Sequence, residues 1–105
     1  MQQLSLKPLA RRLVQCLERA GIVVEALYLF GSHARDEATE DSDIDILLVS
    51  PSFVGKPFWT RCMRTGEALS DIAEPVQLYP VTLDEFRRPE PGGWLVSLAP
   101  DLQPL

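Results

Sequence analysis

Apolar side chains near the start of the chain recur at the spacing of one helix face. This stripe consists of Leu9, Leu13, Cys16, Leu17 and Ala20. Most charged residues of the segment lie off the stripe, as in an amphipathic helix with one buried face. Gly21 follows directly, and a glycine at this position commonly ends a helix. The pattern predicts a helix over residues 9–20.

Three later segments have the pattern of β-strands. Residues 22–30 are rich in β-branched and aromatic side chains and stop abruptly at a Gly-Ser pair, which predicts a buried strand followed by a turn. Residues 43–49 alternate between two faces and predict a second strand. Residues 76–81 predict a third strand, in which Pro80 indicates an edge position or an early end.

Helices and loops account for the remaining segments. Residues 58–72 have a loosely helical spacing and predict the second main helix, and the polar residues 33–42 predict a short helical turn and a loop. Thr82, with Glu85 three residues later, forms a capping box that starts another helix. Residues 89–105 contain four prolines and two glycines and predict a loop-rich C-terminal tail.

Length and composition limit the architecture. The 105 residues, 46% of them hydrophobic, suffice for one ordinary core and not for two. No apolar run approaches the roughly 20 residues of a membrane helix, and residues 1–10 lack the apolar core of a signal peptide. Cys16, Cys62 and the single His33 have no spacing typical of a zinc site or a disulfide framework. We expect one α/β domain over residues 1–105, located in the cytoplasm.

The net charge of −5 limits the kind of ligand. A surface that binds nucleic acid along its phosphates needs clustered lysines and arginines, so no extensive nucleic-acid surface is expected. A single nucleotide has other requirements, because a few backbone N–H groups and metal ions can hold a triphosphate. The acidic balance is therefore compatible with nucleotide binding.

The turn after the first strand has the features of an anion site. Gly31 lets phosphate oxygens approach the backbone, and Ser32 adds a hydroxyl donor. A strand that opens here into a short helix also presents free N–H groups and the positive end of the helix dipole. Taken alone, however, a Gly-Ser pair between a strand and a helix is usually only a turn.

Two aspartates in the second strand strengthen this interpretation. Asp43 and Asp45 lie at positions i and i+2, so both carboxylates project from one face roughly 7 Å apart. Carboxylate oxygens suit Mg²⁺ that is bound together with substrate phosphates. The alternative is a solvated polar face, but two acids in an apolar strand repel each other and lower its β propensity. That penalty favours a bound cation.

The combined motif resembles a known family. Gly31-Ser32, Ala34-Arg35 and, after a polar loop, Ser42-Asp43-Ile44-Asp45 are similar to the signature of the DNA polymerase beta-like nucleotidyltransferase superfamily, in particular its minimal members. The resemblance implies an α+β fold in which helices flank a mixed β-sheet. It also implies that Gly31, Ser32, Arg35 and Ser42 bind the nucleoside triphosphate, and that Asp43 and Asp45 bind Mg²⁺ and are catalytic.

The same resemblance suggests an activity and a partner. Minimal members often serve as antitoxins that transfer AMP from ATP to a tyrosine of an all-helical HEPN protein, and others modify antibiotics. We therefore expect a Mg²⁺-dependent nucleotidyltransferase, with a HEPN-type partner or a homo-oligomer as candidates for completing the acceptor site. A catalytically weak antitoxin or binding module is one alternative, and a subunit of a small-molecule nucleotidyltransferase is another.

Two positions depart from the family pattern. Asp36 stands where the family commonly has glycine after the Ala-Arg pair. The family's third carboxylate is expected at position 77, which is a glutamine and cannot take a proton at neutral pH. Glu74 is the nearest replacement and is predicted to be catalytic. Strand alternation places the Glu74 side chain on the face opposite to that of Gln77, so a catalytic role of Glu74 requires a bend of the chain at Pro75.

Other side chains leave two interpretations open. His33 could touch a phosphate or be an exposed loop histidine. Arg35 could bind a phosphate oxygen or pair with an acidic neighbour in the loop. Trp59 and Trp94 are expected to cover the core or a partner in preference to stacking on a base.

Overall fold

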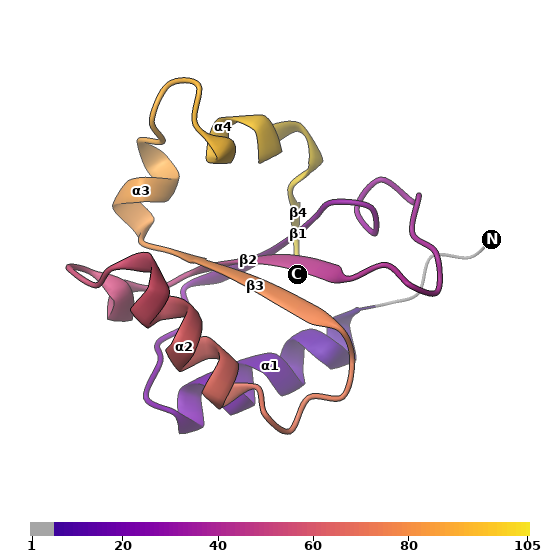
Figure 1. Ribbon diagram of the computed structural model, residues 1–105, viewed down its shortest axis with the longest axis horizontal. Coiled ribbons are helices and arrows are strands. Elements are labelled where there is room, and N and C mark those ends of the chain that lie inside the picture. Colours follow the sequence, from indigo (N-terminus) through magenta and orange to yellow (C-terminus); the bar gives the residue numbers. More distant parts are fainter. Residues whose placement is uncertain (1–5) are drawn as a thin grey trace.

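Four strands form one mixed sheet in the order β3-β2-β1-β4 (Figure 1). The computed structural model describes residues 6–105. Strand β1 (Ala26–Phe30) runs antiparallel to β2 (Ile44–Val49) and to β4 (Gln103–Pro104), and β2 runs parallel to β3 (Val76–Val81). The predicted α+β class with a mixed sheet is confirmed.

Helices lie on both sides of this sheet. In Figure 1, α1 (Lys7–Arg19) and α2 (Phe58–Ala68) lie on one side, and α3 (Leu83–Arg87) and α4 (Trp94–Leu98) lie on the other. Within residues 6–105, no helix is long and apolar enough to cross a membrane.

The sequence pattern extends two elements too far. Residues 69–72 follow α2 as a turn, and Leu69 and Ile72 pack on the main core from there. Residues 22–25 precede β1 without being part of the strand, although Ile22 is buried in the same core. Apolar side chains that are buried from turns continue the hydrophobic pattern, so the pattern alone does not show where an element ends.

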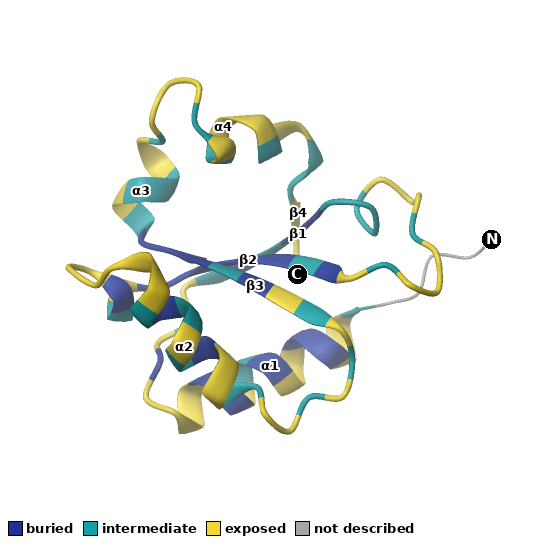
Figure 2. Ribbon diagram, in the orientation of Figure 1, coloured by how far each residue is buried: buried dark blue, intermediate teal, exposed yellow. Residues whose placement is uncertain are grey.

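The central strand β2 is buried on both faces, as Figure 2 shows. Ile46 and Leu48 belong to the larger core, which includes apolar residues of α1. Leu47 and Val49 belong to a smaller core on the opposite face. The predicted alternation of the two faces is confirmed. The face that carries Asp45 is nevertheless covered over most of its length.

The C-terminal segment provides this cover. Where the composition predicts a loop-rich tail, residues 89–105 form α4, the 3-10 turn η2 (Ala99–Asp101) and β4. Leu95, Leu98 and Leu102 pack on the smaller core. Their spacing of three and four residues supplies one apolar face, and this spacing outweighs the turn-forming prolines and glycines.

A buried arginine joins α2 to the end of β3. The Arg61 side chain donates to both carboxylate oxygens of Glu85, with Nη1–Oε1 at 2.6 Å and Nη2–Oε2 at 3.2 Å. It also donates to the backbone oxygens of Lys56 and Pro80. Glu85 accepts in addition from the Thr82 N–H, which completes the predicted capping box. These bonds fix the direction in which the chain leaves β3.

We expect Glu85→Gln to lower the free energy of unfolding by about 1 kcal/mol, a modest loss because the Glu85 side chain is 44% exposed. The hydrogen bond from Arg61 lowers the pKa of Glu85. The stabilisation is therefore complete above the unfolded-state pKa and is lost as the pH falls through the lower, folded-state pKa. Urea unfolding of the wild type and of Glu85→Gln at a series of acidic pH values measures the difference in the free energy of unfolding. This difference should shrink toward zero as the pH falls.

Asp84→Asn is the matched control, because the Asp84 carboxylate, among the residues the structure describes, pairs only with Arg88 at 3.6 Å and both side chains are largely exposed. It should change the free energy of unfolding by less than about 0.5 kcal/mol. Equal losses in the two variants would show that the Arg61–Glu85 pair has no special weight.

Candidate active site

The two predicted metal ligands lie at the beginning of β2, at one corner of the sheet. Asp45 is the second residue of β2 and pairs in register with Phe30 of β1 and Gln77 of β3. Asp43 directly precedes the strand and, by alternation, shares the face of Asp45. Asp43 is exposed and Asp45 is half-buried. We call these two residues the acid pair.

The surroundings of Asp45 change the pKa of its carboxyl group. Partial burial raises the pKa of Asp45, and the neighbouring charge of Asp43 raises it further. His33 and Arg35 act in the opposite direction and lower it. Two neighbouring carboxylates on one strand face favour a bound cation, because a cation stabilises both ionised groups at once.

Gly31 brings the Gly-Ser turn into contact with the acid pair. Its φ of +76° lies in the left-handed region that favours glycine. A Cβ atom at this position would collide with the Oδ2 atom of Asp45. The backbone conformation therefore favours glycine, and any side chain here would force the Asp45 carboxylate, which lies directly against the turn, to move.

The Gly-Ser segment is a single turn and does not begin a helix. The N–H groups of Ala34 and Arg35 donate to Gly31 O at 3.1 and 3.2 Å, and the Glu37 N–H donates to Ser32 O at 2.9 Å. The segment lacks an apolar stripe that would hold a longer helix on the sheet, so no extended helix dipole is present. Among the residues the structure describes, the Ser32 N–H and hydroxyl have no protein partner. Both groups remain available to an anion.

Asp36 adopts the kind of backbone conformation that glycine favours. Its φ is 57°, in the left-handed region that costs most residues roughly 1–2 kcal/mol but that aspartate visits more readily. Replacing the glycine common in the family thus leaves a left-handed turn and adds a negative charge to it.

Arg35 and Ser42, both predicted to bind the nucleotide, each have a structural partner. Arg35 pairs with Glu37 at 3.3 Å and with Asp101 at 3.2 Å, which ties the turn to the C-terminal segment. The Ser42 hydroxyl accepts from the Thr39 N–H at 2.9 Å and shapes the loop before β2. A nucleotide contact of either side chain stays a prediction.

The position expected for a third carboxylate is next to the acid pair but is not acidic. Gln77 pairs in register with Asp45 across the parallel β2 and β3 strands. Within residues 6–105, no group of three or more His, Cys, Asp or Glu side chains is placed to hold a metal ion. A metal-binding role of the two aspartates stays a prediction.

The structure does not bring Glu74, the predicted replacement, to the acid pair. The chain does turn at Pro75, where the Val76 N–H donates to Glu74 O at 2.8 Å. The Glu74 carboxylate then pairs with Arg12 on α1, which contributes to the core on the face opposite the acid pair. The hydrogen bond from Arg12 lowers the pKa of Glu74. The chain therefore bends at Pro75, but the Glu74 side chain lies on the α1 side of the sheet and not beside the acid pair.

Tyr79 is a further residue near the acid pair that the sequence pattern did not indicate. Its ring meets Phe30 edge-on at 5.0 Å between centroids and lies 5.9 Å from the ring of Trp94. Burial raises the pKa of Tyr79, and the charges of the acid pair raise it further, so the phenol lies within electrostatic reach of both aspartates. The available signal was its place two residues after Gln77, on the same strand face.

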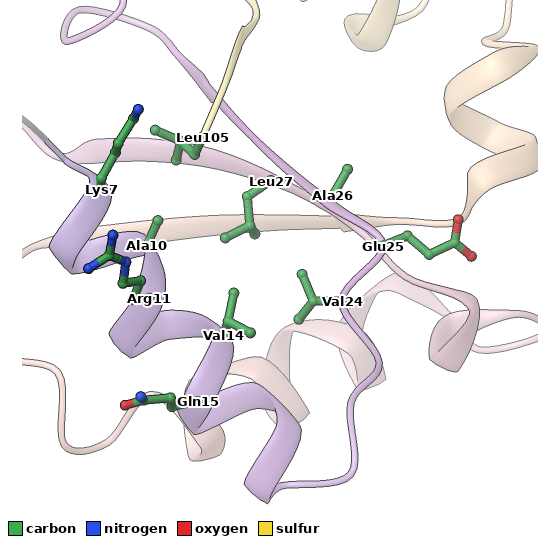
Figure 3. Close-up of a pocket in the computed structure, with 10 residues that line it drawn as sticks. All are labelled: Lys7, Ala10, Arg11, Val14, Gln15, Val24, Glu25, Ala26, Leu27 and Leu105. Atoms are coloured by element: carbon green, nitrogen blue, oxygen red, sulfur yellow. The ribbon is translucent and has the colours of Figure 1, made fainter.

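Two cavities lie away from this corner. One of about 650 Å³ lies between α1 and the edge of β1 and is lined by Ala10, Val14 and Leu27, among others (Figure 3). Another of about 270 Å³ is lined by residues of α2, α3 and α4. The acid pair and Gly31 line neither cavity.

The α+β domain with an acid pair beside a glycine turn has the arrangement that the sequence motif predicts for a nucleotidyltransferase domain. A family profile described as nucleotidyltransferase domain matches residues 10–91. The chain therefore belongs to the nucleotidyltransferase domain family, and the resemblance inferred from the motif is confirmed.

A solved structure supports the fold. The chain is similar to a candidate nucleotidyltransferase from Sulfolobus solfataricus, with 21% sequence identity and a TM-score of 0.59 over 90% of this chain and 76% of that one. At this identity the likeness establishes the common fold. No curated protein gives a significant match.

We expect Gly31→Ala to disrupt both the fold and the site. Alanine in this left-handed backbone conformation should lower the free energy of unfolding by roughly 1–2 kcal/mol. The added methyl group should also displace the Asp45 carboxylate and abolish binding of Mg²⁺ with ATP. Urea unfolding measures the first effect and calorimetric titration the second.

Gly21→Ala separates these two effects. Gly21 has a φ of +81°, but nothing lies within 4 Å of an added Cβ atom. This control should lose similar stability and keep full nucleotide binding. Retained binding in Gly31→Ala would contradict a shared site of the turn and Asp45.

Proposed function

We propose that the domain is a Mg²⁺-dependent nucleotidyltransferase that transfers AMP from ATP to a hydroxyl acceptor. The observation that carries this proposal is the close approach of Gly31 to Asp45, which puts the anion-binding turn beside a carboxylate of the acid pair. Membership of the family supplies the substrate class, a nucleoside triphosphate. The choice of adenine, magnesium and acceptor belongs to the proposal.

The acid pair fits a magnesium ion. Mg²⁺ commonly binds through one or two carboxylates and takes its remaining ligands from phosphates and water. Asp43 and Asp45 offer two such groups on one strand face. When bound there, the ion would neutralise charge on the phosphates and lower the pKa of the attacking hydroxyl.

The remaining groups position the reactants. The Ser32 hydroxyl and N–H would orient the phosphates, and Gly31 leaves their approach open. The acceptor oxygen forms a bond to the α-phosphorus as the bond to the leaving pyrophosphate breaks. Gln77 can hydrogen-bond the acceptor hydroxyl but cannot take its proton. The proton therefore passes to solvent, and we expect slow transfer.

The acceptor we propose is a tyrosine of a HEPN-type helical partner, in a cytoplasmic toxin–antitoxin pair. An exposed aromatic side chain supports a macromolecular partner, since Trp59 is 66% exposed. Alternatively, a second copy of this chain completes the acceptor site. Transfer to a small acceptor such as an antibiotic would also need a second subunit to form the acceptor pocket.

One observation favours a second candidate function, a catalytically weak binding module. Gln77 occupies the place of the third acid, and Glu74 is engaged by Arg12. In that case the domain would bind the nucleotide and its partner without measurable transfer.

Magnesium and ATP should bind together, because the acid pair and the anion-binding turn each supply only part of a site. Calorimetry should detect ATP binding with Mg²⁺ present and at least about ten-fold weaker binding without it. The double variant Asp43→Asn with Asp45→Asn should bind equally weakly in both conditions. Magnesium dependence that survived in this variant would disprove the metal site.

Gln77→Asp should raise the transfer rate by up to about 10²–10⁴-fold, because it supplies a general base beside Asp45. Glu74→Gln should change the rate by less than about two-fold, because Glu74 faces Arg12. AMP transfer from labelled ATP to a co-expressed helical partner gives the rates. If Glu74→Gln abolished transfer in a folded protein, the prediction from the sequence that Glu74 is catalytic would be correct.

A further inference from the structure

Three aromatic rings connect the acid pair to the surface. Phe30 pairs in register with Asp45 and directly precedes Gly31. Its ring contacts Tyr79, and Tyr79 contacts Trp94 at a tilt of 44°. Phe30 is 6% exposed whereas Trp94 is 46% exposed. The series therefore begins inside the fold at the phosphate-binding corner and ends in solvent.

Trp94 also lines a cavity. Together with Phe58, which is 48% exposed, it contributes aromatic surface to the cavity of about 270 Å³ between α2, α3 and α4. The Arg61–Glu85 pair supplies polar groups to the same lining. This volume is slightly below the roughly 300–1,000 Å³ of sites for drug-sized ligands. It suits one planar ring system.

We propose that Trp94 is the stacking platform for the base of the bound nucleotide. Along β3, Tyr79 lies roughly 7 Å beyond Gln77, the register partner of Asp45, and Trp94 lies 5.9 Å from Tyr79. A nucleotide with its phosphates at the corner would lay its sugar over Tyr79 and reach Trp94 with its base. This inference rests on the proposed function.

The backbone around Trp94 holds the platform in place. The Gly93 N–H donates to Glu90 O at 2.9 Å, and the Ser97 hydroxyl donates to Trp94 O at 2.6 Å. A side chain at position 93 would lie only 3.0 Å from Glu90 O. Because the turn is already formed, base binding requires little ordering of the protein.

Single-tryptophan variants test the proposal, since the chain contains two tryptophans. Trp59→Phe leaves Trp94 as the reporter. Trp94→Phe leaves Trp59, which is 66% exposed and belongs neither to the aromatic series nor to the cavity lining. Mg²⁺ with ATP should quench Trp94 fluorescence and leave Trp59 unchanged. Mg²⁺ with tripolyphosphate, which has phosphates but no base, should quench neither.

Affinities from calorimetry complete the test. Trp94→Ala should weaken ATP binding by about ten-fold, as expected for loss of one base–aromatic stack, and should leave tripolyphosphate binding unchanged. Trp94→Phe should restore most of the ATP affinity. Normal ATP binding by Trp94→Ala, or constant Trp94 fluorescence during measured ATP binding, would overturn this inference and leave the proposed function standing. If neither ATP nor tripolyphosphate bound the wild-type protein, both proposals would fail.

Discussion

The fit of the Asp45 carboxylate against the bare backbone of Gly31 is the constraint on which the rest of the site depends. The antiparallel register sets Phe30 beside Asp45, so the next residue of the chain must turn away without a side chain. That register is itself fixed by burial, because a slip of one residue would move Ile46 and Leu48 out of the larger core. Packing of the core thus positions the Gly-Ser turn against the acid pair.

Two ion pairs hold residues 83–105 on the face of the sheet that carries Asp45. Arg61 binds Glu85 of α3 near the start of this stretch, and Arg35 binds Asp101 near its end. Solvent screens the first pair on its Glu85 side only, because the Arg61 side chain is 10% exposed, whereas both members of the second pair are partly exposed. Trp94 lies between these two attachments, so a short, loop-rich segment can still present a ring in a defined place.

Local patterns predicted the features that depend on neighbouring residues. The strand alternation that aligns Asp43 with Asp45 has a period of two and is visible in the sequence, and the family motif located Gly31. Features set by distant contacts were not visible. The side chain of Glu74 is directed by Arg12, 62 residues away, and the position of Tyr79 near the acid pair follows from the parallel pairing of β2 with β3. Neither the Arg12–Glu74 contact nor the pairing of β2 with β3 can be seen in the sequence.

Under the proposed function, the glutamine beside Asp45 favours nucleotide binding over proton transfer. A third carboxylate at position 77 would add negative charge where Asp43 already raises the pKa of Asp45, and every added charge would also repel the incoming triphosphate. A neutral amide removes this repulsion but also removes the general base. Under the proposed function, slow transfer is sufficient if each partner molecule is modified only once.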